Sequence, residues 1–255
     1  MAPGDRWLRR FVKADEAPVR LVCLPHAGGT ASFYLPLCRA LAPQIDVLVV
    51  QYPGRQDRFR EAALPDVDSY VTAIQAALEP WLDRAVAFFG HSMGAVFAFE
   101  IAKRLQHAGR PSPAHVFVSS RRAPSRPRPE NRHTLDDRSL IADLVSMSGD
   151  NGLAEADFEL LASKVAPVLR ADLRALASYR GDPNGCISAP ITAMRGYDDA
   201  STSHEDVLAW RHHTNSAFTM KTFPGGHFYL IDHLQDVTET LATTLCSRPD
   251  LIRRF

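Results

Sequence analysis

Short runs of apolar residues recur along the chain, and most of them are continuous rather than alternating with polar residues. Strands that are buried on both faces of a parallel sheet have this pattern. Segments with the 3.6-residue spacing of amphipathic helices lie between the runs. This alternation predicts an α/β fold, with an open, mostly parallel sheet and helices on both faces. The expected strands cover residues 20–24, 46–50, 85–89, 115–118, 191–194 and 218–223.

Three of the expected helices have recognisable ends. The first amphipathic helix is expected to take Asp68 or Ser69 as its N-cap. The helix that follows the third strand is expected to stop at Gly109. Ser203 and Asp206 have the spacing of a capping box, which would start a helix late in the chain.

Composition and charge exclude several classes of protein. The chain has 255 residues, of which 45% are hydrophobic and 23% charged, so it is not a disordered protein. Lys and Arg number 29 and so do Asp and Glu, a balance that a strongly basic nucleic-acid binder would not show. No apolar run approaches the roughly 20 residues that span a bilayer. The four cysteines lack the spacing of a zinc or dithiol site, and the expected compartment is the cytoplasm.

One region, roughly residues 121–189, breaks the alternation, because no run in it has the pattern of a strand. It opens with a loop rich in proline and arginine and continues with amphipathic helical patterns. A connection this long is an insertion rather than a loop. Since ligands bind at the carboxyl ends of parallel strands, we expect the inserted helices to form a lid. The alternative is a helical hairpin that only caps the sheet; otherwise the chain is expected to be one domain, residues 1–255.

The motif Gly90-His-Ser-Met-Gly94 follows an expected strand and opens an expected helix. This is the context of a nucleophile elbow, a sharp turn that lifts a serine hydroxyl clear of the sheet. The glycines are needed because side chains there would face the neighbouring strand and helix. Ser92 is therefore the expected nucleophile, and the Met93 amide is expected to point at a developing oxyanion.

A serine nucleophile needs a base, and the base needs an orienting acid. The elbow fold predicts the chain order serine, acid, histidine. His227 lies in a glycine-rich turn directly after the last expected strand and is the expected base. In the turn after the preceding strand, Asp199 completes a G-x-x-D sequence and Asp198 is its neighbour. We expect Asp199 to orient the histidine, with Asp198 as the alternative.

A second oxyanion donor is expected from the loop after the first core strand. We assign it to the amide of Ala27, with the amide of Gly28 as the alternative, because glycines there let the backbone approach a ligand. His26 would orient this loop or contact substrate, and the competing reading is a structural histidine. Arg55, in the turn after the next strand, is expected to hold its loop through a salt bridge.

The loop that opens the insertion carries a basic run that Glu130 opposes. Such a run is by default a solvated loop. Because it follows a strand end near the expected mouth of the site, the sharper hypothesis is a docking patch for a phosphate or an acidic partner. The run consists of Arg121, Arg122, Arg126, Arg128 and Arg132.

In their order, these motifs resemble those of the stand-alone type II thioesterases that accompany modular polyketide synthases and nonribosomal peptide synthetases. The resemblance covers about residues 20–245. At the acid it departs from the family, which usually has a proline where this chain has Ala200. The matching segments are Leu24-Pro-His-Ala-Gly-Gly29, Gln51-Tyr-Pro-Gly-Arg55, Gly90-His-Ser-Met-Gly94, Arg122-Ala-Pro124, Leu169-Arg-Ala-Asp-Leu173 with Tyr179, Trp210, and Gly225-Gly-His-Phe228.

The resemblance implies an α/β-hydrolase fold with a mobile helical lid between the sixth and seventh strands. It implies an editing thioesterase that removes short or aberrant acyl groups from the phosphopantetheine arm of acyl or peptidyl carrier proteins, through an acyl-enzyme on Ser92. No cofactor or metal is expected. The basic loop, with Arg121, Arg122, Arg126 and Arg128, would then dock the carrier. Lid residues Leu144, Phe158 and Leu173 would line an acyl chamber.

Fold and triad alone do not separate this activity from others. A carboxylesterase that acts on a small free ester could use the same three side chains. An offloading or macrocyclising thioesterase is a further alternative, although such enzymes are usually fused to a synthase. A non-catalytic binding module is the least favoured alternative, because the chain retains the serine, the histidine and an aspartate.

Overall fold

The computed structural model describes residues 6–148 and 155–247. Within them, seven strands form one sheet in the order β1-β3-β2-β4-β5-β6-β7. Neighbouring strands are parallel except for β1, which pairs antiparallel with β3. The predicted α/β fold is therefore confirmed. The strands are β1 (Leu8–Arg9), β2 (Val19–Leu24), β3 (Asp46–Val50), β4 (Ala85–His91), β5 (His115–Ser119), β6 (Ile191–Gly196) and β7 (Phe218–Phe223).

All six predicted strands are present, and the sequence pattern missed β1. That strand has two residues, too few to show a period, and pairs its Leu8 with Val50 at the edge of the sheet. β2, β3, β5 and β6 are buried at every position, as continuous apolar runs require. β7 is partly exposed because it forms the other edge.

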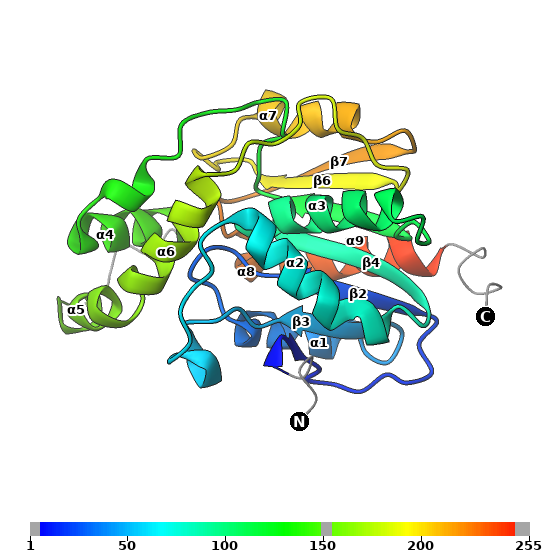
Figure 1. Cartoon of the computed structure of the whole chain (residues 1–255), viewed down its shortest axis with the longest axis horizontal. Helices are drawn as coiled ribbons and strands as arrows, with labels where there is room; N and C mark the ends of the chain where they lie inside the picture. Colours follow the sequence, from blue (N-terminus) through cyan, green and yellow to red (C-terminus); the bar gives the residue numbers. More distant parts are fainter. Residues whose placement is uncertain (1–5, 149–154, 248–255) are drawn as a thin grey trace.

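Helices cover both faces of the sheet (Figure 1). Val22 and Leu24 of β2 pack into the cluster that includes α2 and α3, whereas Leu21 and Cys23 pack into the cluster that includes α1 and α9. No helix in the described parts of the chain is both long and apolar enough to span a bilayer. The helices are α1 (Leu35–Leu41), α2 (Val67–Leu78), α3 (Met93–His107), α4 (Asp137–Ser148), α5 (Glu155–Lys164), α6 (Ala166–Ala177), α7 (His204–Leu208), α8 (Tyr229–Asp232) and α9 (Leu234–Cys246).

Two of the three predicted helix ends are confirmed. The capping box of Ser203 and Asp206 starts α7, and Gly109, with φ of 65°, follows the last turn of α3. The N-cap predicted for α2 is wrong, because the carboxylate of Asp66 accepts the Ser69 amide at 2.7 Å. The helix begins earlier than predicted because Val67 already buries its side chain.

Helices α4, α5 and α6 lie together at one end of the molecule, where Figure 1 shows them beyond the sheet. They connect β5 to β6, within the insertion predicted over residues 121–189, of which residues 149–154 lie outside the described residues. The position implied by the resemblance, between a sixth and a seventh strand, is wrong for this chain. Here the helices follow the fifth described strand, since fewer strands precede them.

The turn between β4 and α3 lies directly against the end of β2. These strands are neighbours in the sheet, with Leu24 opposite Gly90. A Cβ added at Gly90 would lie 2.1 Å from the carbonyl oxygen of Gly94, and one added at Gly94 would lie 1.9 Å from that of Leu24. Real Cβ atoms do not approach backbone so closely. Both glycines of the motif are therefore required by backbone packing, as the sequence predicted.

We expect Gly94→Ala to lower the free energy of unfolding by about 3 kcal/mol or more, at or above the upper end of ordinary overpacking, because backbone cannot move aside as a side chain can. Gly109→Ala is the matched control: nothing lies within 4 Å of its Cβ position, so only the positive φ costs about 1 kcal/mol. Urea denaturation of the two variants measures the difference. Equal destabilisation would contradict the packing argument.

Candidate active site

Ser92 occupies the strained residue of the turn. Its φ of 53° and ψ of −113° are unusual for a residue with a side chain, and it stands at the N-terminus of α3. Its amide donates to the carbonyl of Ser119 at 2.8 Å, which ties the turn to the end of β5. Strain held in this way is typical of a nucleophile elbow.

The structure brings Asp199 and His227 together from the loops after β6 and β7. Nδ1 of His227 lies 3.0 Å from Oδ2 of Asp199, and both side chains are buried. The two loops also bond to each other, because the Asp198 amide donates to the Gly225 carbonyl at 2.9 Å. The side chain of Asp198 is exposed. Of the two candidate acids, Asp199 is the one that contacts the imidazole.

Two hydroxyl side chains that the sequence analysis did not single out complete the surroundings of Asp199. Ser201 Oγ donates to Oδ1 of Asp199 at 2.6 Å and lies 2.9 Å from Nδ1 of His227. Thr202 Oγ1 donates to Oδ2 at 2.9 Å. Hydroxyl residues two and three positions after an aspartate are a recognisable turn pattern, which was the signal available in the sequence.

These contacts keep Asp199 ionised. Burial alone would raise its pKa, but the hydrogen bond and charge of His227, with the hydrogen bonds from Ser201 and Thr202, outweigh burial and hold the pKa well below its ordinary value. An ionised carboxylate at this position favours the tautomer of His227 in which Nδ1 carries the hydrogen and donates it in a hydrogen bond to Asp199. The opposite nitrogen, Nε2, is then left free to accept a proton.

Ser92 and His227 line the same cavity, which has a volume of about 230 Å³. Among the described residues, Ser92 Oγ makes no hydrogen bond. Contacts between nucleophile and base are often long in the absence of substrate, so this arrangement does not argue against the predicted pair. Their roles stay predictions.

Of the three backbone amides considered as oxyanion donors, those of Ala27, Gly28 and Met93, one already donates a hydrogen bond within the protein. Met93 is the first residue of α3, so its amide is one of the donors that a helix leaves without an internal partner. The Gly28 amide donates to Oδ2 of Asp172 at 2.8 Å and is not available to a ligand. Ala27 lines the cavity beside Ser92. This geometry favours Ala27 over Gly28 as the second donor.

Asp172 of α6, a residue that the sequence analysis did not single out for a role, holds this loop in place. Its carboxylate pairs with both terminal nitrogens of Arg55 at 2.8 Å and accepts the hydroxyl of Tyr70 at 2.9 Å. Both charged side chains are almost fully buried. The salt bridge predicted for Arg55 is confirmed, and it joins α6 to the loop that carries Ala27.

His26 is packed rather than solvated. Its ring lies edge-on to Phe33 and Phe228, with centroid distances of 4.9 and 4.8 Å, and it lines the cavity. Burial, with smaller contributions from the charges of His227 and Arg55, lowers the pKa of His26 to about 3. The side chain is therefore neutral at neutral pH.

Of the three side chains predicted to line an acyl chamber, two lie where expected. Leu144 and Leu173 line the cavity beside Ser92. Phe158 of α5 does not line it; this ring lies beneath the guanidinium of Arg138, 4.9 Å from the ring centroid. The prediction for Phe158 is therefore wrong.

The basic run is mostly paired inside the protein. Arg121 and Arg122 both bond to Glu130, and Arg128 bonds to both carboxylate oxygens of Asp206, at 2.8 and 2.7 Å. The prediction of a solvated loop therefore fits Arg126 and Arg128, which are exposed, but not Arg121 and Arg122, whose side chains are mostly buried. Arg132, which pairs with Asp143, completes the run.

Comparison with known proteins agrees with this geometry. The family model described as Thioesterase domain matches residues 19–245. This chain belongs to the thioesterase family. The probable cadicidin biosynthesis thioesterase of Streptomyces griseus is 42% identical over 240 residues, which cover 94% of this chain and 66% of that protein. Thioesterase PikA5 of Streptomyces venezuelae is 40% identical over 94% of this chain and 85% of its own length.

A solved structure extends the likeness to three dimensions. The type II thioesterase BorB from the borrelidin biosynthetic cluster superposes with a TM-score of 0.88 at 42% identity, over 94% of this chain and 98% of that one. The resemblance to type II thioesterases and the α/β-hydrolase fold are confirmed. This thioesterase is therefore a thioester hydrolase, and the roles of its individual site residues remain predictions.

We expect Asp199→Asn to lower kcat by about 10⁴-fold, because an amide no longer holds the imidazole in the tautomer that accepts a proton at Nε2. Asp198→Asn is the matched control, one residue away and exposed, and is expected to retain the rate of the unaltered enzyme. Steady-state hydrolysis of an acyl thioester measures both. Similar losses in the two variants would contradict the choice of acid.

Proposed function

We propose that this thioesterase edits polyketide or nonribosomal peptide synthesis by hydrolysing acyl groups from the phosphopantetheine arm of carrier proteins. The observation that carries the proposal is the contact of Asp199 with His227 beside Ser92, in a chain related to thioesterases of biosynthetic clusters. A cytoplasmic setting, beside the synthase, is part of the proposal.

The chemistry proceeds in two halves. Ser92 Oγ attacks the thioester carbonyl carbon while Nε2 of His227 takes its proton, and the resulting oxyanion accepts hydrogen bonds from the amides of Ala27 and Met93. The carbon–sulfur bond then breaks, His227 gives its proton to the leaving sulfur so that the pantetheine thiol departs, and an acyl ester on Ser92 remains. Water, activated by His227, attacks this ester and releases the acid.

The cavity beside Ser92 supports the choice of short acyl groups. At about 230 Å³ it lies below the roughly 300–1,000 Å³ of sites for drug-sized ligands. Its apolar wall comes from Leu144 of α4 and from Leu169, Leu173 and Leu176 of α6. We propose that the insertion of residues 121–189 acts as a lid over this cavity, within a single domain of residues 1–255.

The test presents one short acyl group in three ways: on a carrier protein, on pantetheine, and as an oxygen ester of similar size. We expect the two thioesters to be hydrolysed faster than the oxygen ester, the carrier-bound one fastest, and Ser92→Ala to abolish nearly all turnover. Steady-state kcat/KM for each substrate is the measurement.

Each contrary result has a definite meaning. Equal or faster hydrolysis of the oxygen ester would make the protein a carboxylesterase. A preference for pantetheine over the carrier would contradict the carrier as partner. Binding of the acyl carrier without hydrolysis, together with no reaction of Ser92 with a fluorophosphonate, would point to a binding module.

A further inference from the structure

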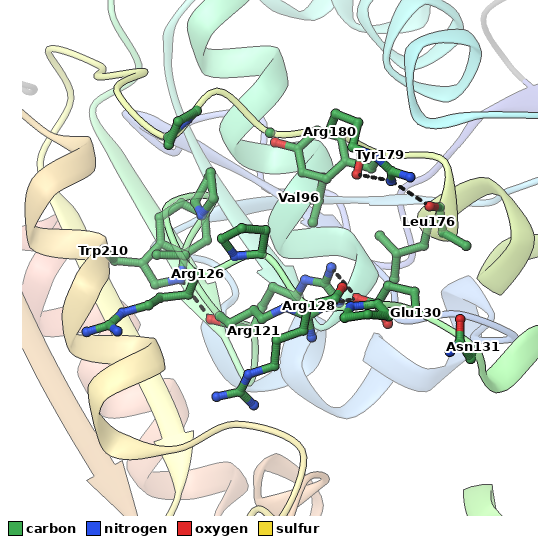
Figure 2. A pocket seen from close by; sticks show the side chains of 18 of the residues that line it. Val96, Arg121, Arg126, Arg128, Glu130, Asn131, Leu176, Tyr179, Arg180 and Trp210 are labelled. Atoms are coloured by element: carbon green, nitrogen blue, oxygen red, sulfur yellow. Dashed lines mark hydrogen bonds and ion pairs between the residues drawn. The ribbon is translucent and has the colours of Figure 1, made fainter.

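A second and larger cavity, of about 610 Å³, adjoins the one that contains Ser92. The two cavities share a wall that includes Arg121, Glu130 and Leu176. The larger cavity has Trp210 on one side and Tyr179 on the other, as Figure 2 shows. Its volume lies within the range of small-molecule sites. The proposed short acyl group lies in the smaller cavity, whose apolar wall the lid leucines form, so the larger cavity is free for another part of the substrate.

The lining of the larger cavity is strongly basic: five guanidiniums line it, and Glu130 is the lining carboxylate. Three of the five are neutralised. Arg121 and Arg122 share Glu130, which Arg121 contacts at 2.8 Å, and Arg128 pairs with Asp206 at 2.7 Å. These three arginines therefore hold the loop together rather than attract a ligand.

The other two arginines have no carboxylate partner among the described residues. Arg126 is exposed, and its guanidinium makes no hydrogen bond or ion pair with the described residues. Arg180 donates to the carbonyls of Ala177 and Tyr179 at 2.8 and 3.1 Å. Figure 2 shows Arg126 near Trp210 and Arg180 beside Tyr179, on opposite sides of the cavity. The rim of the cavity thus carries uncompensated positive charge on both sides.

From this charge and this position we infer that the larger cavity receives the phosphopantetheine arm, with Arg126 and Arg180 attracting its phosphodiester. The inference rests on the proposed function. A phosphodiester is an anion to which guanidinium binds well, and the rest of the arm is a narrow chain with amide and methyl groups that suits apolar walls. The wall shared with the smaller cavity places the thioester end toward Ser92. Of the four arginines predicted to dock the carrier, Arg126 keeps a role in recognition, and Arg180 joins it.

The experiment compares an acyl-phosphopantetheine, which carries the phosphate, with the same acyl-pantetheine, which lacks it. For the double variant Arg126→Gln/Arg180→Gln we expect kcat/KM to fall about tenfold on the phosphorylated substrate, mainly through KM, and to stay unchanged on the other. Arg39→Gln, which removes an exposed arginine of α1, is the matched control and should change neither.

Other outcomes overturn the inference. Unchanged rates on both substrates, or equal losses on both, would mean that the two arginines do not bind the phosphate. If the double variant hydrolysed both free thioesters normally but lost activity on the same acyl group attached to a carrier protein, the two arginines would be assigned to the carrier's protein surface instead. Failure of the unaltered enzyme to hydrolyse either thioester would refute the proposed function itself, so the two failures are distinguishable.

A blocked cavity gives a second, independent readout. Ala177 at the end of α6 lines the larger cavity and not the smaller one. We expect Ala177→Phe to slow hydrolysis of acyl-pantetheine while a small fluorophosphonate still labels Ser92 at the normal rate, and Ala177→Ser to change neither. Normal hydrolysis by the phenylalanine variant would show that the arm takes another route.

Discussion

The first turn of α3 lies so close to the carbonyl of Leu24 that a side chain at Gly94 cannot be accommodated. This contact follows from the sheet, in which β2 and β4 are neighbours with Leu24 opposite Gly90. It places the loop that follows β2 beside the turn that carries Ser92. Ala27 and Ser92 thereby line the same cavity. Backbone packing at two strand ends thus fixes the position of the turn that carries Ser92 relative to the loop that carries Ala27.

A buried ion pair extends this frame to the inserted helices. Asp172 of α6 bonds at once to Arg55, to Tyr70 and to the Gly28 amide. Removing one partner of such a pair leaves an uncompensated buried charge, which lowers the free energy of unfolding by about 3–5 kcal/mol. The helix α6 is therefore tied directly to the loop of Ala27.

Much of the fold and site could be predicted from the sequence because their signals are local. The elbow, the turns that carry Asp199 and His227, and the capping box of α7 each depend on a few consecutive residues next to a strand or helix. Asp199 was preferred to Asp198 on a turn pattern alone, and the contact with His227 agrees with it.

What the sequence did not reveal depends on contacts between distant segments. Arg55 and Asp172 are 117 residues apart, and Arg128 and Asp206 are 78 apart. No local pattern identifies such partners, so Asp172 had no predicted role and the basic run looked more exposed than it is. Phe158 shows the same limit, since periodicity gives the buried face of a helix but not what covers it.

The central claim, that Ser92 carries the reaction, is tested most directly by titrating the enzyme with a fluorophosphonate. The fraction of Ser92 modified, from peptide mass spectrometry, is plotted against the fraction of carrier-thioester hydrolysis that remains. The account predicts that activity falls in proportion to modification and reaches zero when Ser92 is fully labelled. Activity that persists after complete modification of Ser92 would contradict it.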